Sequence, residues 1–136
     1  MKIKFHSIAD QEENNNVVEF EAEASYEITH FKDIFDNDKQ HFHTFTFTDP
    51  QNKQPVRIEI NDSRVNILNN HATLELRHKK FHSGSHVNAN GNKFNLKTFM
   101  NACQVEDTKY YFEYEIFSVN NDPMGKFKIT ITKIDE

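Results

Sequence analysis

Histidine is the residue of this chain whose number and spacing could support chemistry. Of the eight histidines, His41 and His43 form one group, and His78, His82 and His86 form another. Imidazole binds metal ions and transfers protons near neutral pH. Residues two apart on a strand lie on the same side, ~7 Å from each other. No cysteine pair, His-Glu-x-x-His helix or Asp-rich loop accompanies them, so solvated positions are favoured over a metal site, and no metal or cofactor is assigned.

A cationic rim is the second candidate. Arg77 and Lys80 lie beside His78 and His82, and Arg57 belongs to a neighbouring apolar-polar stretch. Guanidinium and ammonium groups bind carboxylates and phosphates through charge-assisted hydrogen bonds. We therefore expect Arg77 and Lys80 to be able to hold the charged head of a ligand at one end of the fold.

Signatures of catalysis are mostly absent. Cys103 has no matching histidine motif, and its apolar neighbours suit a buried, inert thiol. The run Ser83-Gly84-Ser85 lacks the glycines that flank a hydrolase nucleophile. Glu113 and Glu115 alternate with aromatic residues, as on the solvent face of a strand. No catalytic residue is assigned, and a protein without enzymatic activity is favoured.

The elements that would position these residues are strands. Apolar and polar residues alternate with a period of two through most of the chain, which indicates a sheet with one buried face. The longest such stretch is "VVEFEAEASYEIT" at 17–29, and shorter ones include "KIKFHSI", "HFHTFTFT", "VRIEI", "RVNIL", "HATLELRHKKF", "TKYYFEYEIFSV" and "KFKITITKI".

Turn residues separate these stretches. Asn90-Gly91 is typical of a tight hairpin turn, where both residues take positive φ angles. The segment 29–40, "THFKDIFDNDKQ", interrupts the pattern and is interpreted as a loop with at most one helical turn. The sequence thus predicts an all-β fold, a single domain over residues 1–136, with about eight to ten antiparallel strands in an up-and-down barrel.

Composition limits the partners. The net charge is −5 with neutral histidines, and no basic block is present, which disfavours nucleic acid and anionic membranes as partners. The polar N-terminal stretch has no apolar signal-peptide core, and one cysteine suits a reducing compartment. A cytoplasmic protein is expected, and its oligomeric state stays open.

Over nearly its full length the chain resembles the YwiB-like family of uncharacterised bacterial proteins. The resemblance rests on "VEFEAEASYEI", "VRIEINDSRVNILNNHATLELRHKKF", "NANGNKFNLKTF" and "YYFEYEIFSVNNDPMGKFKITI". It implies a lipocalin-like (calycin) β-barrel. Characterised calycin relatives mostly bind small apolar molecules inside the barrel, whereas the family itself implies no established activity.

Three hypotheses follow. A barrel of this size is either filled by side chains or able to hold one small ligand. In the first hypothesis a hydrophobic or amphipathic ligand lies inside the barrel; in the second a filled scaffold acts through its surface; in the third the histidines serve a metal or an enzymatic reaction. The residues assigned to the first are Ala22, Ala24, Phe45, Arg77, Lys80 and Phe112. The alanines also suit a packed interior, where they accommodate aromatic neighbours.

Overall fold

The computed structural model describes residues 1–11, 14–32 and 39–134, which form ten antiparallel strands in a closed barrel. Within these residues there is no helix. The strands are β1 (Lys2–Gln11), β2 (Asn14–Lys32), β3 (Lys39–Thr48), β4 (Pro55–Ile60), β5 (Arg64–Asn69), β6 (Ala72–Arg77), β7 (Phe81–Ala89), β8 (Asn92–Val105), β9 (Lys109–Ser118) and β10 (Pro123–Ile134).

Each strand pairs with its neighbour in the sequence, and β1 pairs with β10 to close the barrel. The closing register runs from Lys2 opposite Ile134 to Asp10 opposite Lys126. Closure pairs the first strand with the last, which removes the two edges that an open sheet would present as templates for aggregation. The predicted all-β fold and up-and-down barrel are therefore confirmed.

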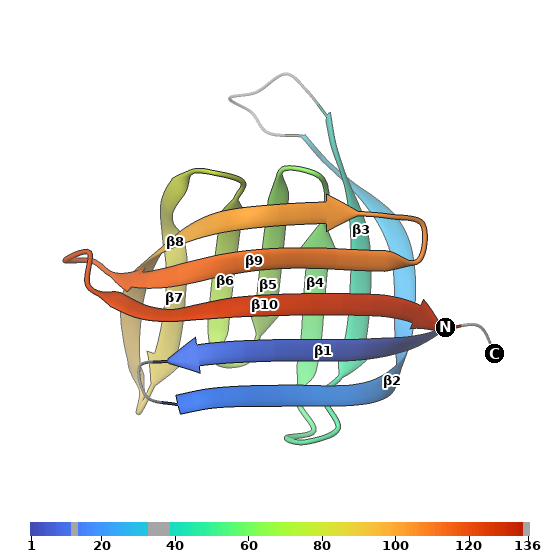
Figure 1. Cartoon of the computed structure of the whole chain (residues 1–136), viewed down its shortest axis with the longest axis horizontal. Coiled ribbons are helices and arrows are strands. Elements are labelled where there is room, and N and C mark those ends of the chain that lie inside the picture. Colours follow the sequence, from blue (N-terminus) through green and yellow to red (C-terminus); the bar gives the residue numbers. More distant parts are fainter. Residues whose placement is uncertain (12–13, 33–38, 135–136) are drawn as a thin grey trace.

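The barrel is flattened into two layers whose strands cross (Figure 1). Strands β8, β9, β10 and β1 form one layer, and β3 to β7 form the other. The long strand β2 belongs to both, because it pairs with β1 up to Glu23 and with β3 from Ala24 onward. Crossed layers require strands that bend at the corners and change layers. Ala24 thus marks the corner of β2.

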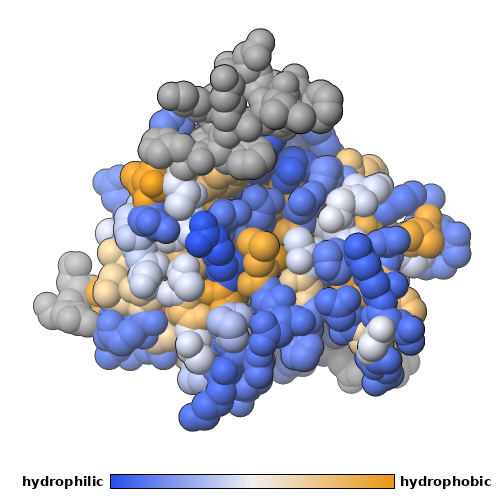
Figure 2. Space-filling model, turned by 180° about the vertical axis from the view of Figure 1, so that it is seen from behind, coloured by the Kyte–Doolittle hydropathy of each residue, from blue (hydrophilic) through white to orange (hydrophobic). Residues whose placement is uncertain are grey.

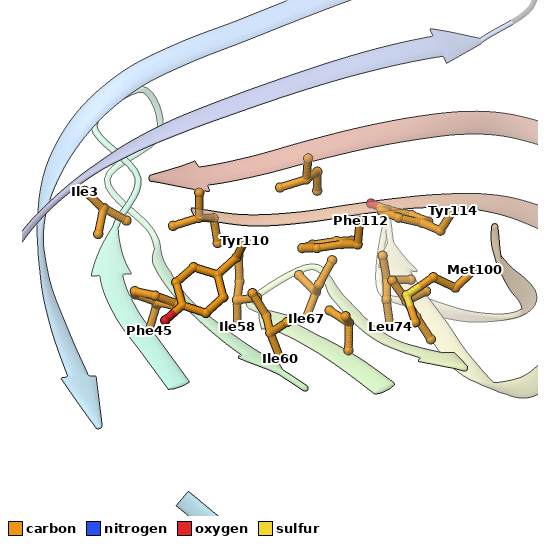
Figure 3. Packing of buried hydrophobic residues seen from close by; sticks show 14 of the residues in the cluster. Ile3, Phe45, Ile58, Ile60, Ile67, Leu74, Met100, Tyr110, Phe112 and Tyr114 are labelled. Atoms are coloured by element: carbon orange, nitrogen blue, oxygen red, sulfur yellow. The ribbon is translucent and has the colours of Figure 1, made fainter. Parts of the chain in front are cut away.

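The core fills the space between the layers, where side chains of β9 point toward those of β4, β5 and β6 (Figure 3). The period-two alternation positions these residues, because every second side chain of a strand points inward. Among the residues that the alternation directs inward, Phe20 is partly buried and packs against this core. Four more inward-directed residues, Ile58, Leu74, Phe112 and Ile129, are less than a tenth exposed.

The hairpin turn between β7 and β8 has the predicted form. Asn90 and Gly91 have φ angles of 52° and 80°, so both central residues are left-handed. A two-residue turn of this kind matches the twist of the strands that it joins. The prediction for Asn90-Gly91 is confirmed.

The ladder between β6 and β7 is short and ends beside a bulge. It pairs only Ala72 with Val87 and Thr73 with His86, and the β7–β8 register shifts between His82 and Ser85. Past the end of this ladder, side-chain hydroxyls take the place of a partner strand at Glu75. The Glu75 N–H donates to Ser85 Oγ at 2.8 Å, and Thr98 Oγ1 donates to the Glu75 carbonyl at 2.7 Å.

This bulge corrects one prediction. The sequence pattern placed His78, His82 and His86 on the face of Leu74, but His86 is the partner of Thr73, whose side chain points to the opposite face. An extra residue in one strand reverses every later side chain. His86 is therefore not on the inward face of Leu74.

The segment 29–40 also differs from the prediction. Strand β2 continues to Lys32 and β3 begins at Lys39, and the two stay paired over this extension, with Thr29 opposite Phe42. Continued pairing gives the backbone groups partners that a loop would not. Residues 33–38 of this segment lie outside the described residues, so the helical turn that the sequence allowed stays a prediction there. Across the described ranges, no helix has the length and apolar character needed to cross a membrane.

Candidate functional site

The interior holds four of the six residues assigned from the sequence. Phe45 and Phe112 are fully buried, and Ala24 is 8% exposed. Ala22 is partly buried against the same core. Ala22 lies opposite Ile3 in the β1–β2 ladder, and Ala24 lies opposite Phe47 in the β2–β3 ladder. At the β2 corner the two alanines thus meet larger side chains, the arrangement expected of a packed interior.

The other two assigned residues lie outside the barrel. Arg77 alternates with the buried Leu76 and therefore faces outward, and Lys80 is exposed in the link between β6 and β7. The structure does not bring Arg77 or Lys80 to the same side of the wall as Ala24. Contact of any of the six with a ligand stays a prediction.

One polar group of residues lies on the inner side, at a corner of the barrel. The tyrosine–histidine cluster consists of Tyr26, His43, Tyr110 and Lys133. The Tyr26 hydroxyl lies 2.6 Å from His43 Nδ1, and the Tyr110 hydroxyl lies 3.3 Å from the same nitrogen. Lys133 Nζ lies 3.8 Å from the centre of the Tyr26 ring, a cation–π contact.

Burial lowers the pKa of His43, and the positive charge of Lys133 adds a smaller effect in the same direction. In the tautomer whose proton is on Nε2, a neutral imidazole accepts a hydrogen bond at Nδ1, and the Tyr26 hydroxyl is the nearer donor. Burial also raises the pKa of the Tyr110 hydroxyl, so that it stays a donor.

The one cysteine is also partly buried. Burial raises the pKa of the Cys103 thiol to about 11, and its Sγ donates to the Asn61 carbonyl at 3.2 Å. An inert thiol is therefore supported.

A groove on the outer face of β3 to β6 is the strongest candidate site. It has a volume of about 280 Å³. The chain contains three arginines, and all three line this groove. Figure 2 shows the molecule from this side, where hydrophilic surface surrounds small hydrophobic areas. The arginine groove is lined by Thr29, Phe42, Arg57, Glu59, Arg64, Asn66, Glu75 and Arg77.

Strand register brings these side chains together. Glu59, Asn66 and Glu75 are successive partners across β4, β5 and β6, and Arg64 is the partner of Arg77. Directly opposed side chains lie close enough to interact, and like charges there repel. Arg64 and Arg77 thus place two guanidinium groups beside a row of hydrogen-bond acceptors.

Hydrogen bonds organise the acceptor row. Arg57 Nη2 donates to Glu59 Oε2 at 3.2 Å, and Asn66 Nδ2 donates to Glu59 Oε1 at 3.1 Å. Asn66 Oδ1 is buried and has no hydrogen-bond partner in the described part of the chain. A buried acceptor of this kind is unusual in a folded protein.

The β3 side of the groove is shielded from solvent. Phe42 and Thr44 belong to the outward-facing set of β3, yet they are only 3% and 1% exposed. The Thr44 hydroxyl lies 2.8 Å from the Thr29 hydroxyl, which satisfies both. The groove therefore combines an apolar wall at Phe42 with charged groups, as small-molecule sites do.

His82 contacts Glu75, a residue that lines the groove on β6. Its Nε2 lies 2.7 Å from Glu75 Oε2. Gly84 makes room for this pair, since a Cβ at Gly84 would lie 2.7 Å from His82 Nε2 and still closer to the Glu75 carboxylate. A larger residue at Gly84 would displace the ends of these two flexible side chains.

A larger hollow, about 710 Å³, lies on the outer face of β1, β2, β9 and β10. Two ion pairs cross its strands, Lys126 with Glu115 at 3.4 Å and Lys128 with Glu113 at 3.6 Å, and no arginine is among its lining residues. Guanidinium groups are the better oxyanion ligands, so the arginine groove is the better candidate for an anion site.

Sequence reasoning found Arg77 and Arg57 but missed Arg64 and the acceptor row. The signal that was missed is the register of the β5–β6 hairpin. Its short link at Asn70-His71 places residues whose numbers sum to 141 opposite each other, which pairs Arg64 with Arg77.

A metal site is a separate question. The described residues contain no group of three or more His, Cys, Asp or Glu side chains that could hold an ion.

Comparison with known proteins supports the fold. No family model and no curated protein matches the sequence. The crystal structure of YwiB from Bacillus subtilis matches with a TM-score of 0.61 at 13% identity, over 98% of this chain and 91% of YwiB. At this identity the likeness shows a common fold alone. The sequence resemblance to YwiB-like proteins is thus supported for architecture, and the calycin relationship stays a prediction.

Proposed function

We propose that the protein is a binding module that holds a small molecule with a carboxylate or phosphate group in the arginine groove. The observation that carries the proposal is that all three arginines of the chain line one groove. Guanidinium groups bind planar and tetrahedral oxyanions through paired hydrogen bonds, which lysine does not match.

The test is a titration of ¹⁵N-labelled protein with phenyl phosphate, whose ring suits the apolar wall at Phe42. We expect saturable chemical-shift changes confined to β3–β6. Arg77→Gln should weaken binding ~10-fold or more, because a charge-assisted hydrogen bond contributes about 1.5–3 kcal/mol.

Lys80→Gln is the matched control, because it removes the same charge nearby from a residue that does not line the groove. Binding should change less than twofold. Equal losses for Arg77→Gln and Lys80→Gln would mean diffuse electrostatic attraction, and shifts spread over the whole barrel would likewise contradict the proposal.

The alternative from the sequence is an amphipathic ligand inside the barrel. It predicts that Ala24→Leu, which fills interior space, weakens binding of a fluorescent fatty acid. The groove proposal predicts no effect of Ala24→Leu on phenyl phosphate, because Ala24 is buried on the inner side of the wall. If neither probe binds, a filled scaffold that acts through other surfaces is the better description.

A further inference from the structure

Exposed apolar side chains gather at one end of the barrel, away from the arginine groove. Among the described residues, eight large apolar side chains are exposed, and three of them, Phe94, Val119 and Met124, line one hollow of about 480 Å³. Their exposed fractions are 50%, 55% and 47%. Single apolar residues are normal on a protein surface, whereas a contiguous group of them indicates an interaction site.

This hairpin hollow is lined by residues of the β7–β8 and β9–β10 hairpins, and the β9–β10 turn projects from one end of the barrel (Figure 1). The two hairpins are joined, because Leu96 of β8 lies opposite Ser118 of β9. Lys97 Nζ donates to Asn121 Oδ1 at 3.0 Å, which ties the β9–β10 turn to β8. Strand pairing and this hydrogen bond therefore hold the walls of the hollow in place.

The floor of the hairpin hollow belongs to the core. Leu96 is 5% exposed, and Val87 is partly buried against the same core. Phe94 shares the parity of Leu96 and lies opposite Val87 in the β7–β8 ladder. The inward, apolar face of this hairpin thus continues past the part of the barrel that buries it. Covering the remaining apolar surface would be favourable in water.

Charged residues of both signs accompany the hollow. Lys93 lines it from β8, and Asp122 lies in the β9–β10 turn, between Val119 and Met124 in the chain. Both charged side chains are exposed. A two-fold axis that runs between the two hairpins would place Lys93 of each copy toward Asp122 of the other. The charges of this face are therefore complementary to those of a second copy of the same face.

A small molecule fits this hollow less well than a second copy does. Phe94, Val119 and Met124 remain about half exposed, so the hollow is open on one side. Small-molecule sites usually enclose most of the ligand surface, which an open hollow does not. A second copy covers the open side and supplies a charge of each sign for the rim.

We propose that the hairpin hollow is the interface of a homodimer, in which it packs against the same face of a second copy. Phe94 and Met124 of each copy contact the hollow of the other, with Lys93 and Asp122 at the rim. Aromatic and Met side chains at the centre and charges at the edge are typical of protein interfaces. The inference is independent of the proposed function, because the hollow and the arginine groove share no lining residue.

Another exposed phenylalanine, Phe81, provides the matched control. It is 65% exposed, and its ring centre lies 4.8 Å from that of Phe99 and 5.5 Å from that of Phe117. Phe81 does not line the hollow. The two exposed residues that precede it, Lys79 and Lys80, have the same charge, so two copies of this region would repel each other.

The test is sedimentation equilibrium of the purified chain over a range of concentrations. We expect the weight-average mass of wild type to rise toward twice the monomer mass. Phe94→Asp should weaken dimerisation at least ~30-fold, because residues at the centre of an interface contribute most of its affinity. Val119→Asp should act in the same direction, and it lies outside the strands, where a substitution disturbs folding less. Phe81→Asp should change the dissociation constant less than twofold.

Charge reversal tests the arrangement of the two copies. Lys93→Glu should weaken the dimer, because it places a carboxylate toward Asp122 of the second copy. Lys93→Glu combined with Asp122→Lys should restore it, since opposite charges then face each other again. Loss of the dimer in the single variant without recovery in the double variant would overturn the assigned pairing.

The remaining outcomes also decide the inference. A wild-type chain that stays monomeric at every concentration would show that the hollow is not a dimer interface. The same conclusion follows if the dimer survives both Phe94→Asp and Val119→Asp in folded protein, or if Phe81→Asp weakens it equally. A monomer that binds anilinonaphthalene sulfonate in a Phe94-dependent manner would instead assign the hollow to a small apolar ligand.

Discussion

The tyrosine–histidine cluster and the arginine groove are both polar, but they lie on opposite sides of the barrel wall. In the cluster, the Tyr26 and Tyr110 hydroxyls meet one imidazole nitrogen of His43. In the groove, charged side chains of both signs line an open volume, and Asn66 Oδ1 has no partner among the described residues.

The difference reflects solvent access. An inward-facing polar group loses water when the protein folds, so it must find a partner within the barrel or destabilise the fold. An outward-facing group can exchange water for a ligand. We therefore interpret the cluster as a structural element that closes a corner of the interior, and the groove as the region available for binding.

The largest expected effect tests whether the inner region is packed. Phe45 is fully buried, with its ring centre 5.1 Å from that of Tyr26 and 5.0 Å from that of Tyr110. Phe45→Ala should lower the free energy of unfolding by roughly 3–5 kcal/mol, because it leaves a cavity under the cluster. Urea denaturation measures this, with the exposed neighbour Thr46→Ala as a control expected to change stability by less than ~0.5 kcal/mol. A loss below ~1 kcal/mol for Phe45→Ala would indicate an interior that is not packed.

A smaller effect tests whether the cluster is structural. Tyr26→Phe removes the hydroxyl that lies 2.6 Å from His43 Nδ1 and keeps the ring. It should reduce the free energy of unfolding by about 1 kcal/mol, the usual contribution of one hydrogen bond. Binding of phenyl phosphate should not change, because Tyr26 does not line the groove. Unchanged stability together with weakened binding would reverse the roles of the two regions.

The smallest effect is a pH dependence of stability from His43. Burial and Lys133 lower its pKa, against an opposing effect of Asp62, and the Tyr26 and Tyr110 hydroxyls face the same ring. Between the lowered pKa and the usual value of ~6.5, the unfolded chain binds more protons than the folded protein. The contribution of His43 is therefore fully present above ~6.5 and decreases as the pH falls through this window.

The measurement is the urea midpoint at pH 7.5 and 5.5 for wild type and His43→Gln. Because the chain has eight histidines, the relevant quantity is the difference between the two proteins. Wild type should lose more stability on acidification than the variant. An equal loss would mean that His43 titrates as it does in the unfolded chain.

Much of the fold follows from local features of the sequence. The alternation in 17–29 specified both faces of β2, and Asn90-Gly91 specified a turn, because side-chain parity and positive φ angles are properties of a few neighbouring residues. Short links then specified neighbouring antiparallel strands and the up-and-down order. The buried positions of Phe45 and Phe112 follow from the same parity.

Other features depend on contacts between residues far apart in the sequence. The bulge at His82–Ser85 arises where β7 leaves β6, and it reversed the expected face of His86. The corner of β2 at Ala24 depends on which strands lie on either side of it. The arginine groove depends on the register of β4, β5 and β6, which no single stretch of sequence encodes. Arg64 and Asn66 were therefore found as groove-lining residues only from the assembled barrel.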